Sequence, residues 1–156
     1  MLTNEFELIL DELGKAFGVP HLTPDDNLKT TCEFQVYGDI IIQIEPDKNP
    51  DYLLIATILG DLPAGKFGED LLEAALKVNG LPAPLNGILA YSQKNNHLLL
   101  FERFRTQNLR GEDLADFIKI FIQKAKIWKE ALNNNRIPVI DEIQSSDRVG
   151  IFGLRP

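Results

Sequence analysis

Cysteine, histidine and long apolar runs are scarce in this sequence. Its 156 residues include one cysteine, Cys32, and two histidines, His21 and His97. A single cysteine excludes an internal disulfide and is typical of a reducing compartment. The two histidines lack the close ligand spacing of a metal site. We therefore expect no metal site, and we expect Cys32 to be a buried, inert thiol rather than a nucleophile.

Positive charge is also in short supply. Lysine and arginine number 16 against 23 acidic residues, a net charge of −7, and the isoelectric point is about 4.8. This balance works against binding to nucleic-acid phosphates or anionic lipids. No apolar run approaches the roughly 20 residues that span a bilayer, and residues 1–5 lack the basic flank and apolar run of a signal peptide. We expect a cytoplasmic protein with no nucleic-acid partner and no membrane insertion.

Signatures of catalysis are missing as well. The sequence holds no Gly-x-Ser-x-Gly elbow, phosphate-binding glycine loop or dinucleotide fingerprint. Three acidic pairs could suggest acid–base chemistry, at residues 69–70, 112–113 and 141–142, but two of these three lie at predicted helix N-termini, where the helix dipole stabilises negative charge. We expect no catalytic residues and no cofactor.

The hydropathy periods that are present predict eight elements in one domain, residues 1–135, followed by a tail over residues 136–156. The order α-β-β-β-α-β-β-α predicts an α+β fold. Helices are expected over Asn4–Phe17, Lys66–Asn79 and Glu112–Leu132, and strands over Glu33–Tyr37, Asp39–Glu45, Tyr52–Leu59, Gly87–Ser92 and His97–Phe104.

The N-terminal elements are amphipathic. Leu8 lies nearly opposite the apolar arc of the first helix, and Ile41 lies on the opposite face from the other isoleucines of its strand. The run Tyr52–Leu59 is almost wholly apolar, which predicts a strand that is central or covered on both faces. The apolar arc comprises Leu2, Phe6, Ile9, Leu10, Leu13 and Phe17, and the apolar strand faces comprise Phe34, Val36, Ile40, Ile42 and Ile44.

The second predicted helix has more apolar surface than a sheet needs to cover. Phe67, Leu71, Ala74, Ala75 and Val78 form one stripe, which Leu72 and Leu76 widen. At about 100° per residue the arc covers roughly 200°. We expect the additional face to be covered by another element or subunit.

The last predicted helix carries a core stripe and a basic run. Phe117, Phe121 and Trp128 have core spacing rather than the arrangement of an aromatic ligand box. Lys124, with Lys126 and Lys129, is interpreted as part of a solvated face. The tail from residue 136 is either mobile or folded back over apolar surface, and protease sensitivity at Arg148 would count against fold-back.

Three segments resemble one known family. Leu72–Asn79 (LEAALKVN), Gly87–Tyr91 (GILAY) and Leu98–Phe101 (LLLF), followed by the helical segment Leu114–Leu132, resemble the core of the Tir-chaperone (CesT) family, the class I chaperones of type III secretion. The resemblance covers roughly residues 2–132 and implies a compact α-β-β-β-α-β-β-α sandwich with an antiparallel sheet. It also implies a homodimer, with a heterodimer as an alternative.

The resemblance further implies two sets of site residues and a function. The protein would bind the N-terminal region of secreted virulence effectors, keeping it extended and secretion-competent without ATP. The implied dimer interface is Leu71, Leu72, Ala75, Leu76, Val78, Leu89 and Tyr91. The implied effector site is Leu2, Phe6, Leu8, Ile9, Phe34, Val36, Ile40 and Ile42.

Two other functions remain open at this point. An adaptor or regulator of the secretion apparatus with the same fold would use the same apolar grooves. A small-molecule binding domain or an enzyme would need a deep pocket lined by converging polar groups.

Overall fold

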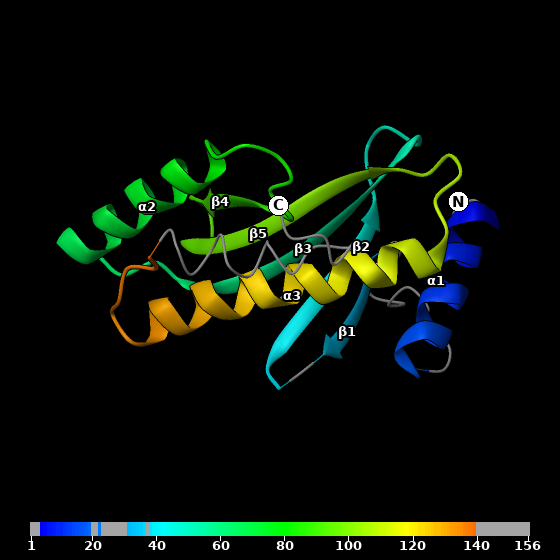
Figure 1. Cartoon of the computed structure of the whole chain (residues 1–156), viewed down its shortest axis with the longest axis horizontal. Coiled ribbons are helices and arrows are strands. Elements are labelled where there is room, and N and C mark those ends of the chain that lie inside the picture. The colour runs from blue at the N-terminus through cyan, green and yellow to red at the C-terminus, as the bar shows by residue number, and fades with distance from the viewer. Residues whose placement is uncertain (1–3, 20–21, 23–30, 37, 140–156) are drawn as a thin grey trace, which may run out of the picture. The chain divides into compact units, whose positions relative to one another are not determined.

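The computed structural model describes residues 4–19, 22, 31–36 and 38–139 (Figure 1). Eight elements follow one another in the predicted order. They are α1 (Asn4–Phe17), β1 (Cys32–Val36), β2 (Ile40–Pro46), β3 (Tyr52–Asp61), α2 (Lys66–Asn79), β4 (Ile88–Ser92), β5 (His97–Arg105) and α3 (Gly111–Asn133).

The five strands form one sheet in the order β1-β2-β3-β5-β4. β1 pairs antiparallel with β2, with Phe34 opposite Ile42, and β4 pairs antiparallel with β5, with Leu89 opposite Leu100. β3 occupies the middle of the sheet, which confirms the central position predicted for it. Its residues alternate between buried and less buried, and Ile58 is exposed, so the described part of the chain leaves some of one face uncovered.

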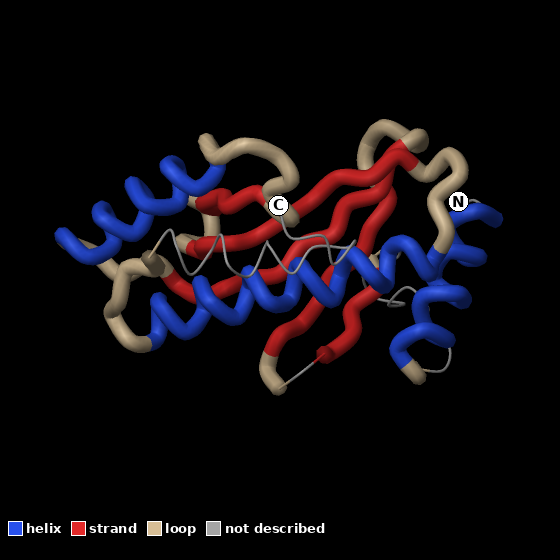
Figure 2. The backbone as a smooth tube through the Cα atoms, in the orientation of Figure 1, coloured by secondary structure: helices blue, strands red, loops and turns tan. Residues whose placement is uncertain are grey.

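The chain divides into two compact units. The first consists of residues 1–57 and 102–119, and it contains α1, β1 and β2, which run side by side as a hairpin in Figure 2. α1 ends where predicted, with Gly18 in the left-handed region at φ 67°. Gly111, at the start of α3, lies against α1, and its backbone N–H donates to the Glu12 carboxylate over 2.6 Å. A Cβ at residue 111 would come within 2.4 Å of the Glu12 Cβ, so this close approach requires glycine.

The second unit consists of residues 58–101 and 120–156, and in it α2 lies beside β4 (Figure 1). Phe121 and Trp128 are fully buried here, which confirms their predicted place in the core. In the first unit Phe117 is half-buried and packs edge-on against Phe104, with 4.7 Å between ring centroids. The aromatic residues of α3 are therefore core residues.

Lys124 overturns one prediction. It is 1% exposed rather than part of a solvated face. Its ammonium group donates to the carbonyl oxygens of Leu85 and Gly87 at 2.6 and 2.8 Å, which binds α3 to the turn before β4. A buried lysine needs such acceptors because an ammonium group without them pays a large desolvation penalty.

The segment after α3 packs back toward α2. Pro138 is buried and, together with Ile137, lines a hollow of about 330 Å³ with the outer face of α2. The remainder of the predicted tail, residues 140–156 with Arg148, lies outside the described part of the chain.

Candidate functional site

An apolar hollow of about 260 Å³ lies between α2 and the β4–β5 hairpin. Leu76, on its α2 side, is 72% exposed, and Tyr91, on β4, is 42% exposed. An apolar side chain this exposed beside a hollow is typical of an interaction site. The lining residues are Leu72, Ala75, Leu76, Asn79, Leu89, Ala90, Tyr91 and Leu98.

The structure brings together five of the seven residues expected at the dimer interface. These are Leu72, Ala75, Leu76, Leu89 and Tyr91. The other two, Leu71 and Val78, are buried on the opposite side of the helix arc and stabilise the protomer itself. The wide arc of α2 thus divides into a core stripe and an exposed stripe.

Sequence reasoning missed three residues of the hollow: Asn79, Ala90 and Leu98. Leu98 was detectable, because it lies directly opposite Tyr91 in the hairpin register. Asn79 was not, because it looked like an ordinary polar residue at a helix end. Its side chain donates to the Leu89 carbonyl oxygen at 2.8 Å and accepts the Leu89 N–H at 3.0 Å.

The residues expected to bind an effector fall into two groups. Leu8 is 58% exposed, as its position opposite the apolar arc predicts. Leu2 lies outside the described residues. The other six are buried in the core of the single chain, so in this conformation they do not present a contact surface: Phe6, Ile9, Phe34, Val36, Ile40 and Ile42.

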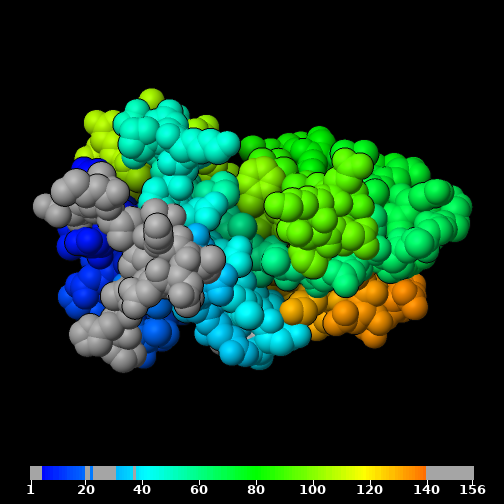
Figure 3. Space-filling model, turned by 180° about the vertical axis from the view of Figure 1, so that it is seen from behind, coloured from blue at the N-terminus to red at the C-terminus, as the bar shows by residue number. Residues whose placement is uncertain are grey.

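Ile41, which was not included in that expected site, is 48% exposed. It lies on β2, on the face opposite Ile40 and Ile42. Figure 3 shows, in cyan, the surface that β1 and β2 form on one side of the molecule. The signal for it was present in the sequence: three consecutive isoleucines in a strand necessarily place one on the other face.

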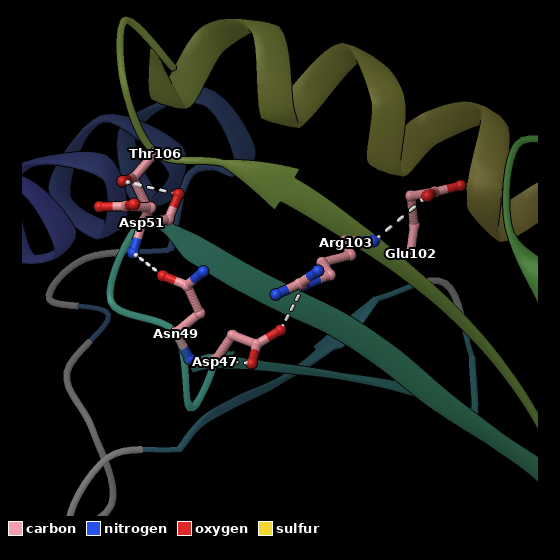
Figure 4. Close-up of polar contacts among 6 residues, drawn as sticks. All are labelled: Asp47, Asn49, Asp51, Glu102, Arg103 and Thr106. Carbon is pink, nitrogen blue, oxygen red and sulfur yellow. Dashed lines mark hydrogen bonds and ion pairs between the residues drawn. The ribbon is translucent and has the colours of Figure 1, made fainter.

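A polar network holds the turn between β2 and β3 (Figure 4). Asp47 accepts the Asn49 N–H at 3.2 Å and forms an ion pair with Arg103 of β5. The Asn49 backbone N–H, with the Arg103 guanidinium, holds the pKa of Asp47 below its usual value. Asn49 in turn accepts the Asp51 N–H at 3.0 Å, and the Thr106 hydroxyl donates to the Asp51 carbonyl at 3.2 Å. These polar groups hold two loops together.

The Arg103 guanidinium also lies 3.8 Å above the centre of the Tyr52 ring. This distance is within the range of a cation–π contact. Arg103 therefore joins β5 to both the turn and the first residue of β3.

Two of the three acidic pairs that could suggest chemistry supply a carboxylate to an ion pair, and the third, residues 141–142, lies outside the described part of the chain. Asp113 forms an ion pair with Arg110 at 2.9 Å, and the hydrogen bond from Arg110 holds the pKa of Asp113 below its usual value. Asp70 pairs with Lys66 at 2.6 Å. Cys32 is buried as predicted, and burial raises the pKa of its thiol, which disfavours the reactive thiolate.

The described residues offer neither a cluster of metal ligands nor a membrane-spanning helix. Nowhere among them do three or more His, Cys, Asp or Glu residues gather in a group that could hold a metal ion. Their helices likewise include none with the length and apolar character needed to cross a membrane.

The fold is similar to that of chains in several solved complexes. A chain of the ExoT–SpcS complex from Pseudomonas aeruginosa matches with 17% identity and a TM-score of 0.61, over 80% of this chain and 97% of the other. A chain of the HopA1–SchA chaperone–effector complex matches with 17% identity and a TM-score of 0.65, over 81% and 94%. The structure of the type III secretion chaperone SycH of Yersinia pestis with a fragment of YscM2 matches with 18% identity and a TM-score of 0.58, over 77% and 96%. At such identities the similarity establishes the fold, and the predicted α+β sandwich is confirmed.

The sequence itself supports a closer relationship. No curated protein matches it. A model of the Tir chaperone protein (CesT) family, however, matches residues 8–129, from within α1 almost to the end of α3. Because this match spans most of the sequence and all five strands, the chain belongs to the Tir chaperone protein (CesT) family.

Proposed function

We propose that this protein is a cytoplasmic chaperone of type III secretion that binds the N-terminal region of a secreted effector and keeps it extended. The observation that carries this proposal is the family match over residues 8–129. The HopA1–SchA structure, a chaperone–effector complex of similar fold, supports it. Binding would use apolar surface and backbone hydrogen bonds, so the chain would need no ATP, no cofactor and no catalytic residue.

The proposal includes a dimer built on the α2–β4 hollow, with a second copy of the chain as its occupant. Leu76 protrudes next to the hollow, so the same patch supplies both a protruding side chain and a cavity. This is the self-complementarity that a two-fold interface requires. Leu72 and Tyr91 would be covered by the same contact.

The effector would contact the first unit through Leu8. The six buried apolar residues of α1, β1 and β2 would not touch the effector. They would contribute indirectly, because as core residues they hold the helix that carries Leu8 in place. A disordered segment that folds on binding loses about 2–5 kcal/mol of its gross interaction energy to ordering. Exposed apolar side chains such as Leu8 are needed to offset that cost.

Leu8→Asp is expected to weaken effector binding about tenfold and to leave folding unchanged. Leu8 is already 58% exposed, so the substitution removes little buried area from the folded protomer. Burying the exposed part of the Leu8 side chain against a partner would contribute roughly 1.4 kcal/mol to binding, which is a factor of ten in affinity. Calorimetric titration with the effector's N-terminal segment measures the change.

Ala16→Asp is the matched control, because it adds the same charge at an exposed position of the same helix. It should bind as the unmodified protein does. Equal affinity of the two variants would remove Leu8 from the effector site.

Co-purification from the native host with mass spectrometry tests the function itself. Recovery of secreted proteins through their N-terminal regions supports the chaperone. Recovery of apparatus or transcription proteins without effectors would instead identify an adaptor or regulator of the secretion apparatus.

A further inference from the structure

β4 is one of the two terminal strands of the sheet and is only five residues long. Terminal strands present unpaired N–H and C=O groups, which readily accept another strand. In an antiparallel pair, successive residues turn these groups alternately toward the partner strand and away from it. The sheet can therefore be extended at this end only if the N–H and C=O groups that β4 turns outward have no other hydrogen-bond partner.

The outward groups at Leu89 are already occupied. The Asn79 carboxamide donates to the Leu89 carbonyl oxygen at 2.8 Å and accepts the Leu89 N–H at 3.0 Å. A neighbouring strand would make the same two hydrogen bonds. Asparagine can make both because its carboxamide carries a donor and an acceptor, as a peptide group does.

The hairpin register agrees with this reading. Leu89 lies opposite Leu100, and because both of its backbone groups bond to Asn79, this pair is of the non-hydrogen-bonded kind. By alternation, Tyr91 is the next residue of β4 to present its backbone groups outward.

Two further contacts hold Asn79 and β4 in place. Gly80, which follows Asn79, ends α2: its N–H donates to the carbonyl oxygens of Leu76 and Lys77, and the Leu81 N–H donates to that of Val78. At the start of β4, Lys124 binds the carbonyl oxygens of Leu85 and Gly87. The helix end and the strand are thus fixed relative to each other within the second unit.

We infer that Asn79 is a specificity-determining residue that closes the outer edge of β4 to strand addition. With the Leu89 groups occupied, only Tyr91 of the five-residue strand presents its backbone groups outward, which is too few for a strand to be added. A partner at the α2–β4 surface must then pack side chains against Leu76 and the hollow. The inference rests on the backbone geometry of β4 and stands whether or not the chain binds an effector.

The test places Asn79→Ala in a Leu76→Asp background. Leu76→Asp removes packing at the hollow, so a protein with Asn79 intact should remain a monomer at this surface. With Asn79→Ala added, the edge is open, and we expect concentration-dependent association by light scattering together with an infrared signal of intermolecular β-structure. A double variant that stays monomeric at the same concentrations would overturn the inference.

Amide hydrogen exchange provides a residue-level measurement. In the Leu76→Asp background the Leu89 amide should exchange more slowly than that of Tyr91, because only Leu89 has the Asn79 acceptor. Asn79→Ala should accelerate exchange at Leu89 at least tenfold and leave Leu98 unchanged. The comparison of Leu89 with Tyr91 needs no substitution at residue 79, so it tests the inference even where Asn79→Ala does not fold. Equal exchange rates of the Leu89 and Tyr91 amides would count against the inference.

Asn95→Ala is the matched control. Asn95 is exposed in the turn between β4 and β5 and is the same residue type. Its substitution should change neither association nor exchange at Leu89. The same effect from both substitutions would show that loss of hairpin stability, and not the opened edge, is responsible.

Discussion

Leu76→Asp is expected to convert the dimer into a folded monomer, with the dissociation constant raised by at least two orders of magnitude. Leu76 is 72% exposed in the protomer, so a carboxylate at this position remains in water when the chain is alone. In a two-fold interface the substitution occurs twice, and each copy loses about 1.5–3 kcal/mol of apolar burial. Because each 1.4 kcal/mol is about tenfold in affinity, the combined loss of about 3–6 kcal/mol exceeds a hundredfold. Burying the new charges without partners adds to the loss.

Sedimentation equilibrium gives the dissociation constant, and circular dichroism shows whether the monomer is folded. Lys77→Asp is the matched control: it is the adjacent exposed residue of α2, it changes the charge by more, and it does not line the hollow. A Lys77→Asp dimer beside a Leu76→Asp monomer would separate apolar contact from charge repulsion. A Leu76→Asp protein that remains dimeric at micromolar concentration would place the interface elsewhere.

Phe121→Ala is expected to lower the free energy of unfolding by about 3–5 kcal/mol. Phe121 is fully buried and lies so close to Gly87 that a Cβ at residue 87 would come within 3.1 Å of its ring. Removing the ring leaves a cavity that the surrounding side chains fill only in part. The loss is a large share of the about 5–15 kcal/mol that stabilises a typical domain.

Urea unfolding followed by the fluorescence of Trp128, the only tryptophan, measures this loss. Phe121→Leu should lose less, and Lys119→Ala, an exposed position of the same helix, should change stability by no more than about 0.5 kcal/mol. If the midpoint of Phe121→Ala equalled that of the unmodified protein, Phe121 would not be a core residue, and an aromatic ligand box would again have to be considered.

The elements that the sequence predicted well are those whose pattern is local. The repeat of Phe6, Ile9 and Leu13 placed α1, and glycine at residue 18 marked its end, because helix geometry and its termination depend on neighbours a few residues apart. The unusually wide apolar arc of α2 predicted that its additional face is covered by another element or subunit. Leu76 on that face is 72% exposed in the single chain, and its coverage by a second subunit stays a prediction.

The candidate sites were harder to predict. Strand alternation assigned Phe34, Ile40 and Ile42 to one face but did not say whether that face meets the protein's own helices or a partner, and the structure buries all three. The position of Lys124 does carry a signal of its burial, since it lies three residues after Phe121 and four before Trp128, on the core side of α3.

By itself, the sequence determined the order of the helices and strands, the amphipathic faces and the excess apolar surface on α2. These depend on residue periodicity, which any short segment displays. Tertiary structure decided which apolar face remains in water, and it gave Lys124 and Asn79 their backbone acceptors and donors. Those partners come from other elements, and only packing brings an ammonium or a carboxamide to the backbone groups that make its position favourable.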